Sequence, residues 1–259
     1  MKKFSIVVKD DQESLLIAND IRKRLFHGEM SYSEKEPDIV CVIGGDGTFL
    51  AAVHKYVNIL DKTVFVGINT GTLGFFIDYT VDELDKYIND ILYREPEIES
   101  HRLLKTTVFS DKTRSYLAVN EARIDNMIRT QNIEVQVNGY KLEDFRGSGL
   151  CISTQAGSTA YNRAINGAVV ERGLEVMQLA EIAGVHNVHY RSLGAPLILN
   201  GNSVITLHSD FDETSLLCFD RYAINLKGVT AIEVTLAAES FKLARYEEFN
   251  YIKHFSELF

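Results

Sequence analysis

The sequence predicts two domains: an N-terminal α/β domain built on a parallel sheet and a β-rich C-terminal domain. Short apolar runs alternate with helical patterns over the first hundred residues, which is typical of a parallel sheet covered by helices. After Pro96 the runs become short and rich in β-branched and aromatic residues, as in an all-β fold. The length of 259 residues lies between one large domain and two ordinary ones.

The N-terminal domain is expected over residues 1–98. Its apolar runs predict strands, and the continuous run at 39–43 is typical of a strand covered on both faces. Helical spacing predicts the helices, of which the first ends at His27-Gly28 and the third opens with a capping-box pattern. The expected strands are 4–8, 39–43 and 64–68, and the expected helices are 12–26, 48–57 and 80–93.

The C-terminal domain is expected over residues 99–245. Asn138-Gly139 between alternating stretches is a strong signal for a two-residue hairpin. At least one helix is expected to begin near Thr159, and the segment 246–259 is expected to form a helix that returns to the first domain. The expected strands are 105–109, 116–119, 133–137, 204–208, 215–219 and 230–236.

Composition excludes several classes of protein. Apolar residues make up 46% and charged residues 24%, as in soluble globular proteins, which excludes extensive disorder. The balance of 27 basic and 36 acidic residues gives a net charge of -9, so no broad basic face is expected to attract nucleic acid or anionic lipid. The first apolar run stops at Lys9, too short for a signal peptide, and no stretch approaches the ~18 apolar residues of a membrane span. We therefore expect a cytoplasmic protein with neither membrane nor nucleic acid as partner.

Cysteine and histidine residues give no metal signature. Cys41, Cys151 and Cys218 are far apart and lack CxxC spacing, so each is expected to be a small buried residue without a disulfide. His186 and His189 are three residues apart, but no third ligand is visible, and no zinc site is expected.

The sharpest local motif is Gly44-Gly45-Asp46-Gly47-Thr48, between a buried strand and a helix. Its glycines allow positive φ and let a ligand approach bare backbone, and the helix N-terminus that follows suits phosphate. The motif is neither a dinucleotide fingerprint nor a P-loop, because no lysine follows the last glycine. Asp46 could hold a divalent metal, accept a proton from an attacking hydroxyl, or cap the helix, and the local sequence leaves all three open.

Two further motifs follow expected strands. A glycine-rich turn over 67–75 comes after the next strand of the same sheet, and adjacent loops at the carboxyl ends of parallel strands converge on one crevice. An ordinary turn is the alternative reading. Asn120-Glu121 places an amide beside a carboxylate, which suits a ribose diol or an adenine edge, although a strand-end turn explains the pair nearly as well.

The segment 145–162 is rich in glycine and small hydroxylated residues and connects a strand to a helix. Such a segment can wrap a base and its ribose, and Tyr161 offers a flat face for stacking or hydrogen bonding. A polar strand-to-helix connection with a serine or threonine N-cap is the alternative.

These motifs together resemble the three signatures of bacterial NAD kinases: residues 44–48, Asn120-Glu121, and residues 147–161. Their order and spacing agree across essentially the whole chain. The first motif alone is not specific, because diacylglycerol-type lipid kinases share it and phosphofructokinases carry a close relative. The lipid kinases continue with a Pro-Leu-Gly-Thr-Gly-Asn turn, whereas this chain has Asn-Thr-Gly-Thr-Leu-Gly-Phe at 69–75.

The resemblance implies transfer of a phosphoryl group from ATP to the 2′-hydroxyl on the adenosine ribose of NAD, giving NADP and ADP, with Mg²⁺. It implies a homotetramer in which each dinucleotide site is shared between two subunits. Asp46 would accept the proton, with the neighbouring glycines lining the pocket. The further residues that the resemblance places at the nucleotides are Asn120, Glu121, Arg146, Ser148, Thr159, Ala160, Tyr161, Asn162, Arg163 and Ala164, with Ala183 and Tyr190 at the nicotinamide end, partly from the neighbouring subunit.

The chain departs from the family pattern at a few positions, and these bear on the shape of the pocket rather than on the reaction class. Ser148 stands where the family usually has aspartate, and Gln155-Ala156 where it has Pro-Thr or Pro-Ser. Arg221 follows Asp220, where many members have glycine. Two other functions stay open: a lipid- or sugar-type kinase, and a non-catalytic NAD or NADP sensor. ATP-dependent formation of NADP separates them.

Overall fold

The computed structural model describes residues 1–71, 74–186, 192–247 and 251–258. The chain divides into two compact units, residues 1–101 with 239–259, and residues 102–238. The expected domain boundaries, 1–98 with 246–259 and 99–245, stay a prediction. Two strands, β6 (Glu97–Phe109) and β17 (Ala231–Arg245), each contribute residues to both units.

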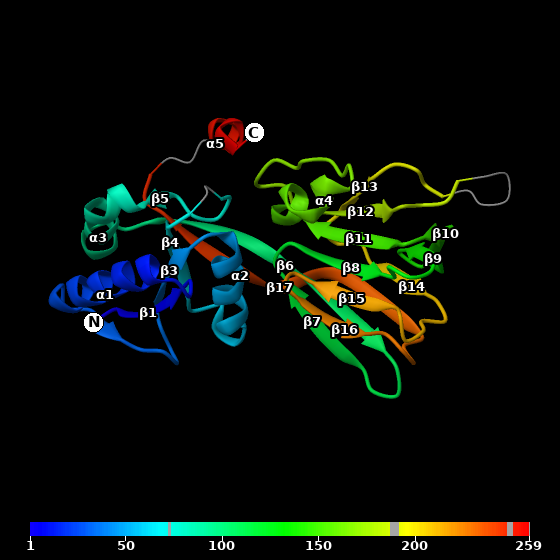
Figure 1. Ribbon diagram of the computed structural model, residues 1–259, viewed down its shortest axis with the longest axis horizontal. Coiled ribbons are helices and arrows are strands. Elements are labelled where there is room, and N and C mark those ends of the chain that lie inside the picture. The colour runs from blue at the N-terminus through cyan, green and yellow to red at the C-terminus, as the bar shows by residue number, and fades with distance from the viewer. Residues whose placement is uncertain (72–73, 187–191, 248–250, 259) are drawn as a thin grey trace. The chain divides into compact units, whose positions relative to one another are not determined.

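Unit 1 is a parallel sheet in the order β2-β1-β3-β4, and the end of β17 pairs with β4, also in parallel (Figure 1). The α/β fold expected for the N-terminal part is therefore confirmed. Every residue of β3 is buried, as expected for a central strand of a parallel sheet. The strands are β1 (Lys3–Val8), β2 (Ser31–Tyr32), β3 (Ile39–Gly44), β4 (Val64–Asn69) and the two-residue β5 (Tyr79–Thr80).

Helices cover both faces of this sheet. α1 (Gln12–His27) and α3 (Leu84–Tyr93) pack with Val66 and Ile68 of β4 in one apolar cluster. α2 (Asp46–Lys55) lies on the other face, where the ring of its Phe49 meets the ring of Phe65 edge to face, with 5.7 Å between the ring centroids. Successive residues of β4 thus point to opposite faces, as the pleat of a strand requires.

Local capping signals set the helix ends. The expected capping box forms between Thr80 and Glu83 on a 3-10 turn, Val81–Glu83, that leads into α3. α2 begins at Asp46, two residues earlier than expected, because the Gly45 carbonyl accepts from the N–H groups of Thr48 and Phe49 at 2.9 and 3.1 Å. α2 ends at Lys55, two residues before the expected end at Val57, and a second 3-10 turn, Val57–Ile59, follows it.

Unit 2 is a two-layer β structure, which confirms the β-rich domain (Figure 1). One layer has the antiparallel order β13-β12-β11-β8-β15-β16, and the other contains β10-β9-β14 with parts of β17 and β6, and β7. An apolar core lies between the layers and includes Ile124, Ile152 and Leu217. The strands are β7 (Arg114–Ala118), β8 (Glu121–Asp125), β9 (Gln131–Val137), β10 (Tyr140–Gly147), β11 (Gly149–Thr154), β12 (Val176–Ile182), β13 (Leu197–Asn200), β14 (Ile205–His208), β15 (Leu216–Phe219) and β16 (Tyr222–Asn225).

Within unit 2 the hairpin signal is confirmed, and a short helix begins close to the expected position. Asn138 and Gly139 have φ of 52° and 79°, the left-handed values that a tight two-residue hairpin between β9 and β10 needs. The expected helix near Thr159 consists only of a 3-10 turn, Ala156–Thr159, and a four-residue helix α4, Tyr161–Ala164. Cys218 is half-buried and not fully buried as predicted, whereas Cys41 and Cys151 are buried.

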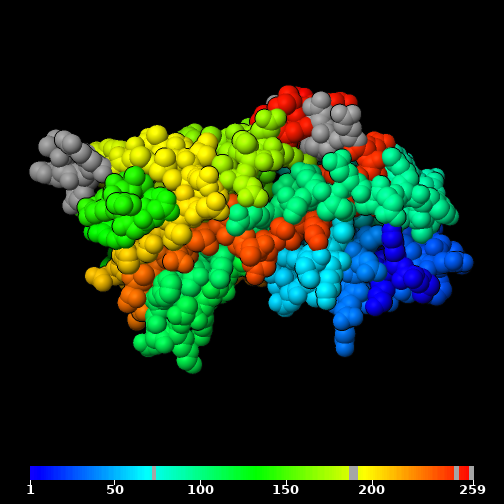
Figure 2. Space-filling view, turned by 180° about the vertical axis from the view of Figure 1, so that it is seen from behind, coloured from blue at the N-terminus to red at the C-terminus, as the bar shows by residue number. Residues whose placement is uncertain are grey.

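Two peripheral elements complete the fold. The turn that joins β6 to β7 projects from the rest of unit 2 and is exposed (Figures 1 and 2). In unit 1, α5 (Tyr251–Leu258) contacts the second glycine-rich turn, where His254 Nε2 donates to the Gly74 carbonyl at 2.7 Å. None of the helices in the described ranges is long and apolar enough to cross a membrane. A cytoplasmic location stays a prediction.

Candidate functional site

The first glycine motif forms the junction between β3 and α2 in unit 1. Gly44 has φ of 153°, and a Cβ at this position would lie 2.3 Å from Thr48 Oγ1, so only glycine fits. Gly45 and Gly47 differ, because nothing lies within 4 Å of the Cβ that either would carry. Open space therefore borders the bare backbone at the N-terminus of a ten-residue helix, where the positive end of the dipole suits an anion.

Asp46 does not cap its own helix, which corrects that reading of the motif. The N-cap is Gly45, and the two Asp46 carboxylate oxygens accept from the N–H groups of Phe75 and Phe76 at 2.9 and 3.2 Å. A Cβ on Gly74 would lie 2.3 Å from one of these oxygens, so glycine at 74 leaves room for the carboxylate. The second glycine-rich turn thus holds the side chain of the first. Thr72 and Leu73 of this turn lie outside the described residues.

In unit 2, Asn120 and Glu121 lie where the chain enters β8. The Asp220 carboxylate, which follows β15, accepts from the N–H groups of Val119 and Asn120, both at 2.8 Å. Asn120 Oδ1 and Glu121 Oε2 are buried, and neither has a hydrogen-bond partner within the described part of the chain. Buried polar atoms are normally paired, so two orphaned oxygens on adjacent residues are typical of a site that awaits donors.

The environment of Glu121 favours its neutral form. Burial and the negative charge of Asp220 raise the pKa of this carboxyl to about 7, although the positive charge of Arg123 partly opposes them. A carboxyl with this pKa changes charge near neutral pH. Groups of this kind in a polar site are candidates for ligand binding or proton transfer.

The turn after β11 lies against Asn120. Thr154 Oγ1 donates to the Val119 carbonyl at 2.7 Å and accepts from the Gly157 N–H at 3.0 Å. A Cβ on Gly157 would lie 2.0 Å from the Asn120 carbonyl oxygen, so glycine permits this close approach. The second and third sequence motifs are therefore brought together within unit 2.

The predicted residues at 159–164 have different environments. Thr159, Ala160 and Tyr161 are half-buried, while Arg163 and Ala164 are exposed. Asn162 is fully buried, and its Nδ2 donates to the carbonyls of Ser158 and Ala168 at 3.4 and 3.3 Å. In this structure Asn162 therefore supports the turn around α4.

Three predicted residues lie together at the opposite end of β11. Ser148 donates from its N–H to the Ile182 carbonyl at 3.0 Å, and the Arg146 carbonyl accepts from Val185 N–H at 2.7 Å, on either side of Ala183. Glu121 pairs with Ser153, five residues along β11 from Ser148. At about 3.3 Å per residue this is about 17 Å. Within one chain, unit 2 does not bring Arg146, Ser148 and Ala183 to Glu121.

Comparison with known proteins decides the family. Residues 5–96 match the family described as ATP-NAD kinase N-terminal domain, and residues 117–246 match the ATP-NAD kinase C-terminal domain. NAD kinase 1 of Bacillus cereus (strain ATCC 10987 / NRS 248) is 36% identical over 260 residues, covering 99% of this chain and 98% of the relative. The NAD kinase of Geobacillus stearothermophilus is 36% identical over 263 residues, 99% of this chain and 96% of the relative.

The chain belongs to the ATP-NAD kinase family. The suspected resemblance and the fold class are confirmed. Among solved structures, a yeast NADH kinase complexed with NADH is similar with a TM-score of 0.86 at 18% identity, covering 100% of this chain and 87% of that chain. An NAD kinase from Archaeoglobus fulgidus in complex with ATP gives 0.77 at 21% identity, covering 99% and 96%. At these identities the likeness shows the fold.

Set beside the NAD kinase signatures, the structure adds residues that the sequence motifs missed. Asp220 orients the Asn120 backbone, and Arg123 stacks on Tyr161. For Arg123 a signal exists, because residues two apart on a strand share a face and Glu121 precedes it by two. Asp220 carries no such local signal, since it acts on a segment distant in sequence.

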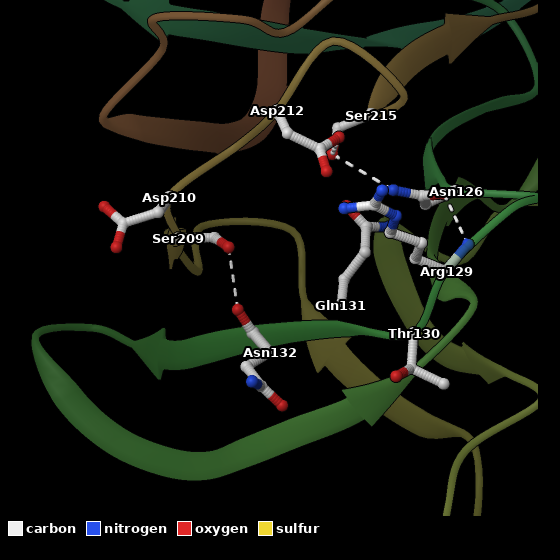
Figure 3. Close-up of a pocket in the computed structure, with 9 residues that line it drawn as sticks. All are labelled: Asn126, Arg129, Thr130, Gln131, Asn132, Ser209, Asp210, Asp212 and Ser215. Atoms are coloured by element: carbon white, nitrogen blue, oxygen red, sulfur yellow. Dashed lines mark hydrogen bonds between the residues drawn. The ribbon is translucent and has the colours of Figure 1, made fainter.

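Other features lie apart from the NAD kinase signatures. Tyr190 and His189 fall outside the described residues. A polar pocket of about 310 Å³ in unit 2 is lined by residues of the 126–132 and 209–215 segments, and none of the predicted site residues lines it (Figure 3). No group of three His, Cys, Asp or Glu side chains suited to a metal occurs in the described ranges.

Proposed function

We propose that the protein transfers the terminal phosphoryl group of ATP to the 2′-hydroxyl on the adenosine ribose of NAD, giving NADP and ADP. The family membership supports the reaction. The observation that carries the residue assignment is the Asp46 carboxylate, fixed by two backbone N–H groups at the N-terminus of a helix whose glycines face open space.

Asp46 acts as the general base in this proposal. The ribose hydroxyl oxygen forms a bond to the terminal phosphorus, the bond to the oxygen bridging to ADP breaks, and the hydroxyl proton passes to Asp46. The N–H groups of Phe75 and Phe76 hold the carboxylate in one orientation. Such proton transfer contributes roughly 10²- to 10⁴-fold to turnover.

The phosphates of ATP would lie along Gly44, Gly45 and Gly47. Beyond the local backbone, no atom in the described part of the chain lies within 4 Å of the position that a Cβ would occupy at Gly45 or Gly47. Phosphate oxygens can therefore approach the backbone N–H groups closely. Mg²⁺ would arrive with ATP, since this ion keeps most of its ligands from water and substrate phosphates and needs only one or two carboxylates. The donor substrate is therefore magnesium ATP.

NAD would bind in unit 2. Glu121 Oε2 and Asn120 Oδ1 are the unpaired acceptors available to ribose hydroxyls or an adenine amino group, and Tyr161 offers its ring. The remaining contacts proposed along α4 come from Thr159, Ala160, Asn162, Arg163 and Ala164.

The site would be shared between subunits of a homotetramer. Support comes from the separation of about 17 Å along β11 between the Ser148 and Ala183 end and Glu121. One dinucleotide contacted by both groups is more easily accommodated if Arg146, Ser148, Ala183 and Tyr190 reach it from a neighbouring copy. Dilution into monomers should then abolish activity, and sedimentation run beside the assay at equal concentration tests this. A fully active monomer would contradict it.

The direct test is ATP-dependent formation of NADP by the wild-type protein and by Asp46→Asn. The variant should lose roughly 10²- to 10⁴-fold in kcat, while NAD binding stays within a few-fold, because the amide keeps the shape and removes a charge near the phosphates. Asp111→Asn, at the exposed turn between β6 and β7, is the matched control and should behave as wild type.

Each alternative has its own outcome in this assay. NAD binding without any NADP formation would indicate a sensor, and phosphorylation of a lipid or sugar instead of NAD would indicate another kinase. If Asp46→Asn kept more than about a tenth of the wild-type kcat, the assignment of the base would be wrong.

A further inference from the structure

β8 presents two different faces. Ala122 and Ile124 point into the apolar core, so Glu121, Arg123 and Asp125 share the opposite face of the strand. Glu121 is already part of the proposed NAD site. The next two residues on the same face, Arg123 and Asp125, have no role in the proposed phosphoryl transfer.

Arg123 lies under the ring of Tyr161. Its guanidinium carbon is 3.8 Å from the ring centroid, and Nη1 makes an ion pair of 3.1 Å with Asp125 Oδ2. The side chains of Arg123 and Asp125 are only 20% and 16% exposed. A guanidinium stacked on an aromatic face is stabilised more strongly when both groups are shielded from water, and the ion pair fixes the plane of the guanidinium.

The strands on either side leave room for this stack. Arg123 pairs with Cys151 of β11 and with Cys218 of β15, so both cross-strand neighbours are short. A long or branched side chain at either place would compete with the guanidinium for the space above the sheet. The arrangement therefore depends on three strands and on α4, all within unit 2.

We propose that Arg123 is a positioning residue for NAD: its guanidinium supports one face of the Tyr161 ring, so that the ring is presented in a fixed orientation to the bound dinucleotide. The proposal rests on the assignment of Tyr161 to the NAD site. Arg123 itself need not touch NAD. Its effect belongs to substrate binding and not to the phosphoryl-transfer step.

Arg123 has a second effect, on the charge of Glu121. Burial, Asp220 and Asp125 raise the pKa of Glu121 to about 7, against the opposing effects of Arg123 and the Tyr161 N–H. The thiols of Cys151 and Cys218 flank Arg123 on the neighbouring strands. They are kept neutral, since burial raises the pKa of each thiol. Loss of the arginine charge therefore raises the pKa of Glu121 and keeps it protonated to higher pH.

The experiment is a double-mutant cycle on the Michaelis constant for NAD at saturating ATP, with Arg123→Met, Tyr161→Leu and the double variant. Arg123→Met should raise KM for NAD by roughly 2- to 30-fold with kcat changed little, the range expected for a shielded cation–π contact. In the Tyr161→Leu background the same change should have little further effect, because the group through which Arg123 acts is gone.

Two further measurements separate positioning from a general structural role. In Arg123→Met the rise of KM on acidification should begin at higher pH than in wild type, whereas Arg123→Lys keeps the charge and should retain the wild-type pH profile with a smaller rise in KM. Arg114→Met, an exposed arginine on β7, should match wild type throughout. Melting temperatures show which variants are folded, and Arg123→Lys carries the test if Arg123→Met is not.

The outcomes that overturn the inference are distinct from failure of the proposed function. If Arg123→Met multiplies KM equally in both backgrounds, or lowers kcat alone, Arg123 does not act through Tyr161. If Tyr161→Leu leaves KM for NAD unchanged, the placement of Tyr161 in the site fails and the inference fails with it. Absence of NADP formation by the wild-type protein would instead overturn the function itself.

Discussion

Replacing Glu121 by glutamine should make the protein more stable above neutral pH while weakening NAD binding. Glu121 is 6% exposed, and burial together with the charge of Asp220 raises its pKa from 4.5 to about 7. The folded state therefore resists ionisation of this carboxyl more than the unfolded state does. Glutamine has nearly the same shape and never carries the charge.

The sign and size follow from proton linkage. Below about pH 4.5 the carboxyl is protonated in both states and no penalty arises. Between about pH 4.5 and 7 it ionises in the unfolded chain first, so stability falls as pH rises, and above about 7 the penalty is complete. The complete penalty is about 3 kcal/mol, of which about 1 is already present at pH 5. The advantage of Glu121→Gln should therefore grow by about 2 kcal/mol between pH 5 and pH 8.

Urea denaturation of both proteins at pH 5 and pH 8, at equal protein concentration, measures this difference. The chain has no tryptophan, so far-ultraviolet circular dichroism is the appropriate probe. Glu171→Gln, at an exposed position, is the control and should give no pH-dependent difference from wild type. If the gap between Glu121→Gln and wild type is the same at both pH values, or narrows at pH 8, the burial argument for Glu121 is refuted.

Three other substitutions have defined outcomes. Ser148→Asp should lower KM for NAD by up to about tenfold with little change in kcat, because a charge-assisted hydrogen bond replaces a neutral one. Steady-state kinetics at saturating ATP measures this, and loss of all activity would show a pocket built around serine. Gly74→Ala should reduce kcat by at least tenfold while NAD binding persists, since its Cβ would displace the Asp46 carboxylate, and unchanged kcat would contradict this. Gly139→Ala should reduce the free energy of unfolding by about 1 kcal/mol, because φ is 79° and no atom crowds the position, and a thermal melt that matches wild type would refute it.

Local signals in the sequence predicted local structure well. The capping box at Thr80 and the hairpin at Asn138-Gly139 were predictable because each is set by a few adjacent residues. The buried run at 39–43 predicted β3 for the same reason. The start of α2 was misplaced because Gly45 and Gly47 are typical of a loop, although Gly47 is helical and the Gly45 carbonyl accepts the first hydrogen bonds of the helix.

The interactions within the candidate site could not be predicted, because they join segments far apart in the chain. The Asp46 carboxylate accepts hydrogen bonds from the N–H groups of Phe75 and Phe76, about thirty residues away. The Asp220 carboxylate accepts one from the N–H group of Asn120, a hundred residues away. The motif predicted the presence of a carboxylate, but only the fold determines its partners. The same holds for Arg123, whose stack on Tyr161 depends on α4 folding over β8.

The discontinuity of unit 1 has a consequence for the order of events during synthesis. Unit 2 is complete in sequence once residue 238 has been made, whereas unit 1 still lacks residues 239–259. Phe241 belongs to that last segment; it is fully buried, meets the rings of Phe49 and Phe76 edge to face and is stacked on His101. On the ribosome unit 2 can therefore fold first, while the loop at residues 44–48 becomes fixed only after residues 239–259 have completed the core of unit 1.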